Sequence, residues 1–166
     1  MGDKHHMTDY AEYTAVMNTY GRADIAFVRG DGCWLESETQ DRYLDCASGI
    51  AVNTLGHSHP RLVAALQDQA SKLWHTSNLY RIPGQEQVAK RLAALSGLDQ
   101  VFFCNSGAEA TEAAVKIARR AAFEKGMADR TTILCASGAF HGRTLGMLAA
   151  TDRPAFRTGF GPMPAG

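Results

Sequence analysis

Apolar and polar residues alternate in three short segments near the start of the chain. These segments are residues 25–29, 33–38 and 42–46. Turn-forming residues separate them at positions 30–32 and 38–41. Alternation between closely spaced turns is typical of antiparallel strands joined in chain order. The pattern therefore predicts a small antiparallel meander.

Further along, apolar residues recur at the spacing of a helix. Pro60 suits a first helical position, and the pattern predicts a helix over residues 60–74. A second helix is predicted over residues 85–95, with Gly97 just past its end. Each helix has an apolar face that we expect in the core: Val63, Leu66, Ala70 and Leu73 in the first, Val88, Leu92 and Leu95 in the second.

Two largely apolar runs without alternation, residues 101–104 and 132–135, indicate parallel strands buried on both faces. An alanine-rich helix to about Lys125 is predicted between them, and on its exposed side Glu112 and Lys116 have the spacing of an ion pair. Strand, helix and strand form a right-handed βαβ unit. The predicted fold class is therefore α/β.

Two parallel strands cannot form a stable sheet alone, because each needs neighbouring strands and helices on both faces. We therefore expect further sequence after Gly166 that completes the domain. The predicted organisation is a polar tail over residues 1–14, an amino-terminal meander segment over 15–59 and the incomplete start of a large domain over 60–166.

The composition favours a soluble globular protein that acts on small molecules. The chain is 45% hydrophobic and 20% charged. Its 17 basic and 17 acidic residues are balanced, and the basic ones are scattered, which argues against nucleic acid or a membrane surface as a partner. No apolar run approaches the roughly 20 residues of a spanning helix, and the start does not resemble a signal peptide. We expect a cytoplasmic protein.

The cysteines and histidines indicate no metal or thiol chemistry. Free thiols buried in apolar stretches are expected at Cys33, Cys46, Cys104 and Cys135. No carboxylate or thiolate is fixed near His57 and His59, so no metal site is expected, and His57 should bond to backbone groups of its turn. A Cys104 nucleophile with His141 as its base is disfavoured, because an apolar strand disfavours the thiolate.

A first candidate site follows the run at residues 101–104. Ser106, Gly107 and Ala108 lie between the predicted strand and the alanine-rich helix. Free backbone N–H groups and the positive end of a helix dipole at such a junction bind anions such as phosphate. The alternative is a helix that is simply capped by Ser106.

A second candidate site follows the run at residues 132–135. Phe140 is placed to stack on a planar ring. Arg143 is placed to bind a carboxylate through two N–H groups of its guanidinium. The alternative is a core aromatic and a surface charge at the start of a helix that runs through Leu148. Ligands of α/β sheets bind beyond the carboxyl ends of the strands, so we expect both sites to meet in one crevice.

These motifs together resemble a known family. The run at residues 105–114 and the segment Phe140-His141-Gly142-Arg143-Thr144 are similar to those of class III aminotransferases of fold type I, which use pyridoxal 5′-phosphate. Residues 49–60 and 159–162 are most similar to acetylornithine aminotransferases within that class. The resemblance covers about residues 15–166 and implies the amino-terminal part of that fold: a small antiparallel meander and the first part of a large, mostly parallel sheet domain.

The resemblance implies roles for seven residues. The N–H groups of Gly107 and Ala108 would bind the cofactor phosphate beside Ser106. Phe140 would stack on the pyridine ring with His141 also at the cofactor, Arg143 would bind the substrate carboxylate, and Tyr20 would approach the substrate. In the family, the Schiff-base lysine, the aspartate at the pyridine nitrogen and a phosphate-binding threonine of the partner subunit lie beyond Gly166, so no catalytic residue is expected here.

The implied function is transfer of an amino group from N-acetylornithine to 2-oxoglutarate, in arginine or lysine biosynthesis, by a homodimer. Gly49-Ile50 lacks a tyrosine that ornithine-specific relatives have nearby, which favours the acylated donor. Succinyl-diaminopimelate, ornithine and 4-aminobutyrate are the alternative donors within the family. The alternative from another class is an inactive truncated paralogue or binding module, and the isolated chain is expected to be inactive.

Overall fold

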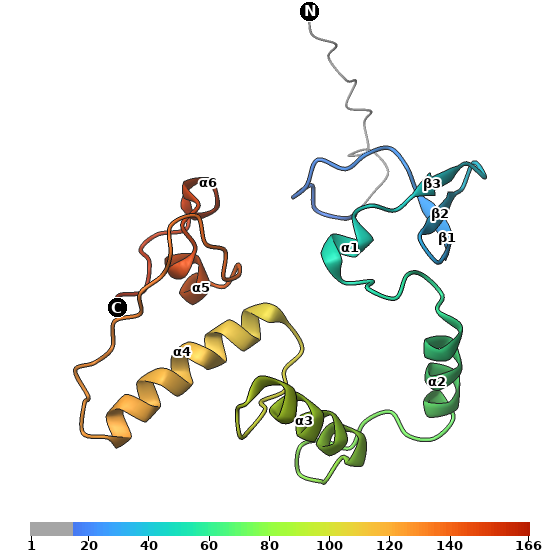
Figure 1. Ribbon diagram of the computed structural model, residues 1–166. Coiled ribbons are helices and arrows are strands. Elements are labelled where there is room, and N and C mark those ends of the chain that lie inside the picture. The colour runs from blue at the N-terminus through green and yellow to red at the C-terminus, as the bar shows by residue number, and fades with distance from the viewer. Residues whose placement is uncertain (1–14) are drawn as a thin grey trace, which may run out of the picture. The chain divides into compact units, whose positions relative to one another are not determined.

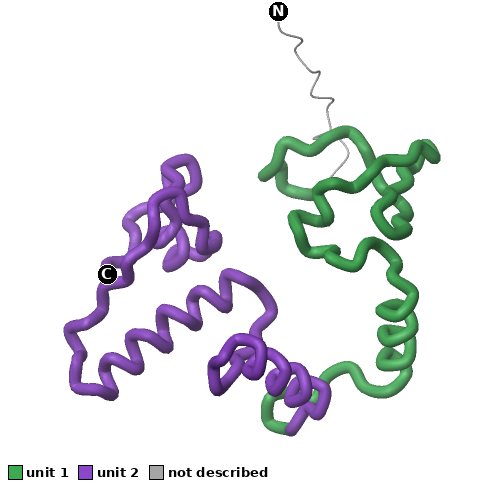
Figure 2. Tube along the Cα trace, in the orientation of Figure 1, with its two compact units in different colours: residues 1–80 green, residues 81–166 purple. Residues whose placement is uncertain are grey.

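The computed structural model describes residues 15–166, so the expected polar tail over 1–14 lies outside the described residues. The chain is divided into two compact units (Figure 2). The first ends at Tyr80 and the second begins at Arg81. Each has its own architecture.

The meander and all the predicted helices form (Figure 1). The elements in chain order are β1 (Phe27–Asp31), β2 (Trp34–Ser37), β3 (Arg42–Leu44), α1 (Ser48–Ala51), α2 (Pro60–Ala70), α3 (Pro83–Ser96), α4 (Gly107–Glu124), α5 (Leu145–Ala150) and α6 (Pro154–Arg157). Helix α2 ends before the predicted Trp74, and α5 begins after Arg143. The short elements α1 and α6 have no counterpart among the expectations from sequence.

Strands β1, β2 and β3 pair antiparallel in that order, which confirms the meander. Asp31 lies opposite Trp34, so the first turn has two residues, and Gly32 takes the positive φ of 54° that such a turn needs. In the second turn, Ser37 Oγ accepts a hydrogen bond from the Asp41 N–H at 3.2 Å. The strand bounds differ from the predicted ones by one or two residues.

The element after β3, α1, is a left-handed turn. Its four residues have positive φ angles: 50° at Ser48, 62° at Gly49, 63° at Ile50 and 62° at Ala51. A residue with a Cβ loses about 1–2 kcal/mol in this conformation, whereas glycine adopts it freely. Ile50 gains no burial in return, because its side chain is 91% exposed. Neighbouring groups must therefore hold the turn.

Asp45 holds the start of α1. Its Oδ1 accepts hydrogen bonds from the N–H groups of Ala47 at 3.0 Å and Ser48 at 2.8 Å. Its Oδ2 accepts from His57 Nε2 at 2.7 Å, and its own N–H donates to the Cys33 carbonyl at 2.8 Å. These bonds to the carboxylate, led by the one from His57, lower the pKa of Asp45 below its ordinary value.

His57 is fixed in turn by the β1–β2 hairpin. Its N–H donates to the Gly32 carbonyl at 2.7 Å, and its carbonyl accepts from the Gly32 N–H at 3.0 Å. The approach requires glycine at position 56, where φ is 77° and a Cβ would lie 2.6 Å from the Gly32 oxygen. We expected the His57 ring to bond to backbone groups, but the ring binds Asp45 and the backbone makes the turn contacts.

In the second unit, α3 ends as predicted. Gly97 takes a left-handed φ of 72°, and its N–H donates to the Ala93 carbonyl at 3.0 Å. Helix α4 contacts α5, and α5 contacts α6. The buried side chains of this unit are Ala122, Met147, Leu148 and Thr151. The small core therefore lies at the end of α4 and around α5.

The two parallel strands predicted at residues 101–104 and 132–135 do not form. A strand exists only where a neighbour accepts and donates its backbone hydrogen bonds, and no described segment pairs with either run. Both runs are nevertheless joined by the predicted helix, which is α4.

The apolar faces expected in the core are also largely exposed. Leu66 of α2 is 71% exposed and Leu95 of α3 is 76% exposed. All four cysteines are free, as expected, but they are exposed instead of buried. Among the described residues, no sheet lies against these faces, so nothing removes them from water.

Because the pKa of Asp45 is lowered, the stability of the α1 turn should depend on pH. A carboxylate with a lowered pKa stabilises the folded form above its ordinary pKa of 3.8, and this contribution is lost as the pH falls through the lowered value. We expect hydrogen-exchange protection of the Ala47 and Ser48 amides to persist to about pH 4 and to decline below it.

The Asp45→Asn variant should lose this protection at neutral pH, because the amide lacks the charge that the two N–H groups bind. Asp68→Asn is the matched control, since Asp68 is exposed and pairs only with Lys72 at 2.6 Å on α2. Unchanged protection in Asp45→Asn would contradict the role of Asp45.

Candidate active site

Helix α4 begins with a reciprocal cap between Ser106 and Glu109. Ser106 Oγ accepts from the Glu109 N–H at 3.2 Å, and the Glu109 carboxylate accepts from the Asn105 N–H at 2.7 Å. Hydrogen bonds from Asn105, followed by those from Ser106, lower the pKa of Glu109. The Ser106 hydroxyl is thus used as a helix cap, as the alternative interpretation of the sequence proposed.

The next two backbone amides remain free. The N–H groups of Gly107 and Ala108 have no hydrogen-bond partner among the described residues. Gly107 is exposed, and no atom lies within 4 Å of the position that a Cβ would take there. Two amides without a partner among these residues, at the positive end of a helix and beside an exposed glycine, fit a phosphate group.

The turn at residues 138–144 is tied to the same end of α4. Thr111 Oγ1 donates to the His141 carbonyl at 2.7 Å. Thr144, which caps α5, donates through its hydroxyl to Glu112 Oε1 at 2.5 Å. The turn that follows the second apolar run therefore lies against the start of α4, and the shared crevice expected from the sequence stays a prediction.

Glu112 has a different partner from the one that its spacing suggested. The predicted ion pair with Lys116 is replaced by the hydrogen bond from Thr144. The Glu112 carboxylate also lies so close to Gly146 that a Cβ there would be 2.6 Å from Oε1. The carboxylate thus joins two segments, while Lys116 is an exposed residue.

Gly142 and Thr151 hold the turn from its inner side. Gly142 has a φ of 136°, and a Cβ on it would lie 3.2 Å from the Cβ atoms of both Ala108 and Met147. Thr151 is completely buried. Its Oγ1 accepts from the His141 N–H at 3.0 Å and donates to the Met147 carbonyl at 2.8 Å.

Arg143 lies against two aromatic rings. Its guanidinium carbon is 3.7 Å from the centroid of the Phe156 ring and 5.6 Å from that of Phe140. The two rings meet edge to face, with centroids 6.1 Å apart. Among the described residues no carboxylate forms an ion pair with Arg143, so its N–H groups are available to a ligand.

Phe156 was not among the candidate residues expected from the sequence. The available signal was Pro154, which suits the first position of a short helix. Nothing in the local pattern relates this helix to Arg143, because the contact depends on how the chain turns after Thr151.

The structure brings six of the seven candidate residues into the second unit, around the start of α4 and the 138–144 turn. They are Ser106, Gly107, Ala108, Phe140, His141 and Arg143. His141 takes part through its backbone N–H and carbonyl. Tyr20 belongs to the first unit, where it is 66% exposed and Arg22 lies 6.0 Å from its ring centroid.

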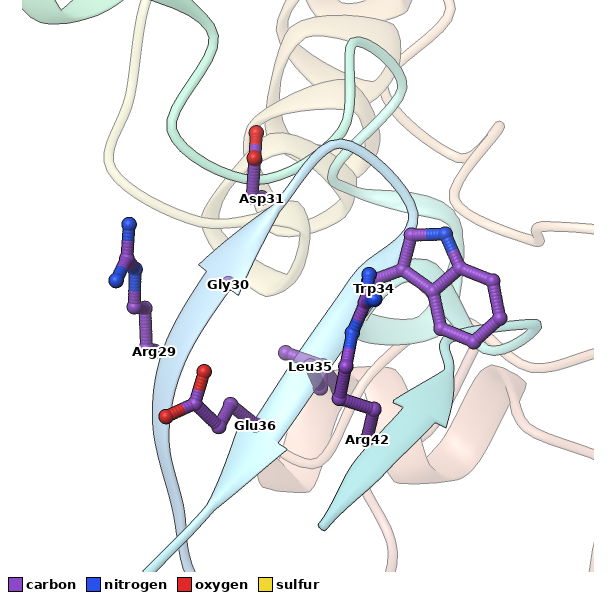
Figure 3. A pocket seen from close by; sticks show the side chains of 7 residues that line it. All are labelled: Arg29, Gly30, Asp31, Trp34, Leu35, Glu36 and Arg42. Carbon is purple, nitrogen blue, oxygen red and sulfur yellow. The ribbon is translucent and has the colours of Figure 1, made fainter. Parts of the chain in front are cut away.

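A separate hollow of about 300 Å³ lies on the meander of the first unit (Figure 3). Arg29 and Glu36 extend from neighbouring strands, and the Arg42 guanidinium lies 4.8 Å from the Trp34 ring centroid. The hollow is lined by both acidic and basic side chains. None of the candidate site residues lines it. The described residues include no cluster of potential metal ligands and no helix able to span a membrane.

A comparison with protein families decides the class of this chain. A family model described as aminotransferase class-III matches residues 15–166. The chain belongs to this family. Its members contain the amino-terminal fold seen here, and pyridoxal phosphate is the cofactor of the class.

Class III relatives are similar over most of this chain. The acetylornithine aminotransferase of Mesorhizobium japonicum is 54% identical over 149 residues, which are 90% of this chain and 37% of that protein. The chain thus spans little more than a third of the length of this relative.

Solved class III structures have the same fold. The N-acetylornithine aminotransferase of Stenotrophomonas maltophilia is 42% identical, with a TM-score of 0.69 over 73% of this chain and 34% of its own. An ornithine aminotransferase of Toxoplasma gondii with pyridoxal phosphate at its active site is 29% identical, with a TM-score of 0.85 over 94% of this chain and 37% of its own. The fold class expected from sequence is confirmed.

The close contact at Gly142 can be tested by Gly142→Ala. The new Cβ would meet Ala108 and Met147 at 3.2 Å while the backbone keeps a φ of 136°. We expect a loss of about 1–3 kcal/mol in unfolding free energy and a lower Tm in the full-length polypeptide. Gly84→Ala is the control, because no atom lies within 4 Å of its Cβ position. An equal Tm for the two variants would show that position 142 tolerates a Cβ.

Proposed function

We propose that this chain supplies the phosphate-binding and carboxylate-binding parts of a pyridoxal-phosphate-dependent acetylornithine aminotransferase. The observation that carries the proposal is the contact between the start of α4, which holds the free amides of Gly107 and Ala108, and the turn that carries Arg143, whose guanidinium has no acidic partner among the described residues. The identity of 54% to an acetylornithine aminotransferase supports the choice of substrate within the class.

The residues fit the cofactor. The Gly107 and Ala108 amides would bind its phosphate, because they have no hydrogen-bond partner among the described residues and Gly107 is exposed. Phe140, whose side chain is 54% exposed, offers a ring face on which the pyridine ring would stack, and His141 would lie beside it. When bound, the cofactor supplies an electron sink for transfer of the amino group.

The substrate is held through its carboxylate. Arg143 would bind the carboxylate of N-acetylornithine and, in the second half of the reaction, that of 2-oxoglutarate. Tyr20 would approach the substrate. Both substrates carry a carboxylate, and a cationic group without an acidic partner among the described residues binds it with little competition from the protein. Ornithine and 4-aminobutyrate are the alternative donors.

The proposal includes the absence of activity in the isolated 166-residue chain. Every lysine among the described residues, at positions 72, 90, 116 and 125, is exposed. An exposed ammonium group is not desolvated into a nucleophile, so none is suited to hold the cofactor covalently. We further propose that the full-length protein is a cytoplasmic homodimer that acts in arginine biosynthesis.

The function is tested with the full-length polypeptide that carries this chain. We expect it to form glutamate from 2-oxoglutarate with N-acetylornithine as donor, at a kcat/KM at least about tenfold above that with ornithine or 4-aminobutyrate. The 166-residue chain should show no turnover, and borohydride with one equivalent of added cofactor should label its exposed lysines without preference for any single one. A preference for another donor or selective labelling of one lysine in the short chain would each contradict one part of the proposal.

The phosphate site is tested by Gly107→Pro. Proline is tolerated at the first helical position, so this change removes one N–H group while the helix is kept. Loss of one hydrogen bond to a charged phosphate should raise the dissociation constant of pyridoxal phosphate by about tenfold or more in a spectroscopic titration.

Gly107→Ala is the matched control, because its Cβ would meet no atom within 4 Å and its N–H remains. We expect the affinity of this variant to stay within about twofold of the wild type. Equal affinities of the proline and alanine variants would exclude the amide from the site.

A further inference from the structure

The guanidinium of Arg143 has no acidic partner to orient it among the described residues. An arginine side chain has several freely rotating bonds, and fixing them on binding costs conformational entropy. A group that holds the guanidinium before the substrate arrives reduces this cost. The aromatic rings beside Arg143 are the groups in contact with it.

Phe156 makes the closer of the two aromatic contacts with Arg143. The distance from the guanidinium carbon to its ring centroid is 3.7 Å, against 5.6 Å for Phe140. A cation within about 6 Å of a ring centroid is attracted by the negative face of the ring, and the attraction increases at short distance. Because a guanidinium carries its N–H donors in its own plane, contact with a ring leaves donors for a carboxylate.

Phe156 is itself held in place by the segment that begins at Asp152, which is hydrogen-bonded to the 138–144 turn. It lies on α6, its N–H donates to the Arg153 carbonyl at 2.9 Å, and its ring is half-buried. The preceding Asp152 accepts from the Gly138 N–H at 2.9 Å through Oδ2 and donates its own N–H to the Ala139 carbonyl at 3.0 Å. The ring and the turn that carries Arg143 are thus parts of one closed loop.

We propose that Phe156 is a positioning residue that holds Arg143 ready for the substrate carboxylate. This inference rests on the proposed function, since it assigns the orientation of the group that binds the carboxylate. It adds a residue outside the motifs that carry the family resemblance. The ring acts only through Arg143 and makes no contact with the reacting atoms.

The test uses the full-length holoenzyme and two donors that differ in one group. N-acetylputrescine is N-acetylornithine without its carboxylate. Phe156→Leu should raise KM for N-acetylornithine about threefold to tenfold, the range expected for loss of a partly exposed cation–π contact, with kcat within about twofold. The kcat/KM for N-acetylputrescine should not change, because that donor has nothing for Arg143 to bind.

Three further variants separate positioning from packing. Phe156→Tyr keeps the ring and should restore the wild-type KM. Phe123→Leu removes a comparable surface contact, in which Arg120 lies 5.4 Å from the ring centroid, and should have no effect. In the Arg143→Gln background, Phe156→Leu should cause no additional change in KM.

A binding measurement gives a readout that does not depend on turnover. The dissociation constant of glutarate, a dicarboxylate without an amino group, should rise in Phe156→Leu by the same factor as KM in calorimetry. An unchanged KM, or an equal loss with both donors, would overturn the role of Phe156 while the proposed function stands. A wild-type protein that transfers no amino group would overturn both.

Discussion

The hydrogen bond from the Thr111 hydroxyl to the His141 carbonyl is the constraint on which the site depends. It joins the first turns of α4, which carry the free amides, to the turn that carries Arg143. A side chain on a regular helix has a fixed direction, so this bond sets the position of the whole turn relative to the helix axis. The second bond, from Thr144 to Glu112, removes the remaining freedom of rotation.

Much of this arrangement could be predicted from local sequence. Ser106 and Glu109 have the spacing of a capping box, and Gly97 marks a helix end, because caps depend on residues that are close in the chain. The meander was also predictable, since period-2 alternation and short turns are local signals. The candidate ligands Gly107, Ala108, Phe140 and Arg143 came from motifs of the same local kind.

Other features could not be predicted because they depend on contacts between distant positions. The pairing of Asp45 with His57 and the contact of Phe156 with Arg143 join segments whose spacing has no periodic signature. The exposure of Leu66 and of the four cysteines was missed for a related reason: an apolar pattern indicates that a face is suited to burial, but burial needs a second surface. The runs at 101–104 and 132–135 lack ladder partners for the same reason.

The left-handed turn α1 has a consequence for the order in which the first unit assembles. Three of its four residues carry a Cβ in a conformation that a free peptide rarely visits. The bonds that offset this cost reach it from Cys33 and Gly32 by way of Asp45 and His57. A short hairpin closes quickly, and the bonds from Gly32 and Cys33 exist only once it has formed. We therefore expect the β1–β2 hairpin to act as a template and α1 to acquire its native conformation after it.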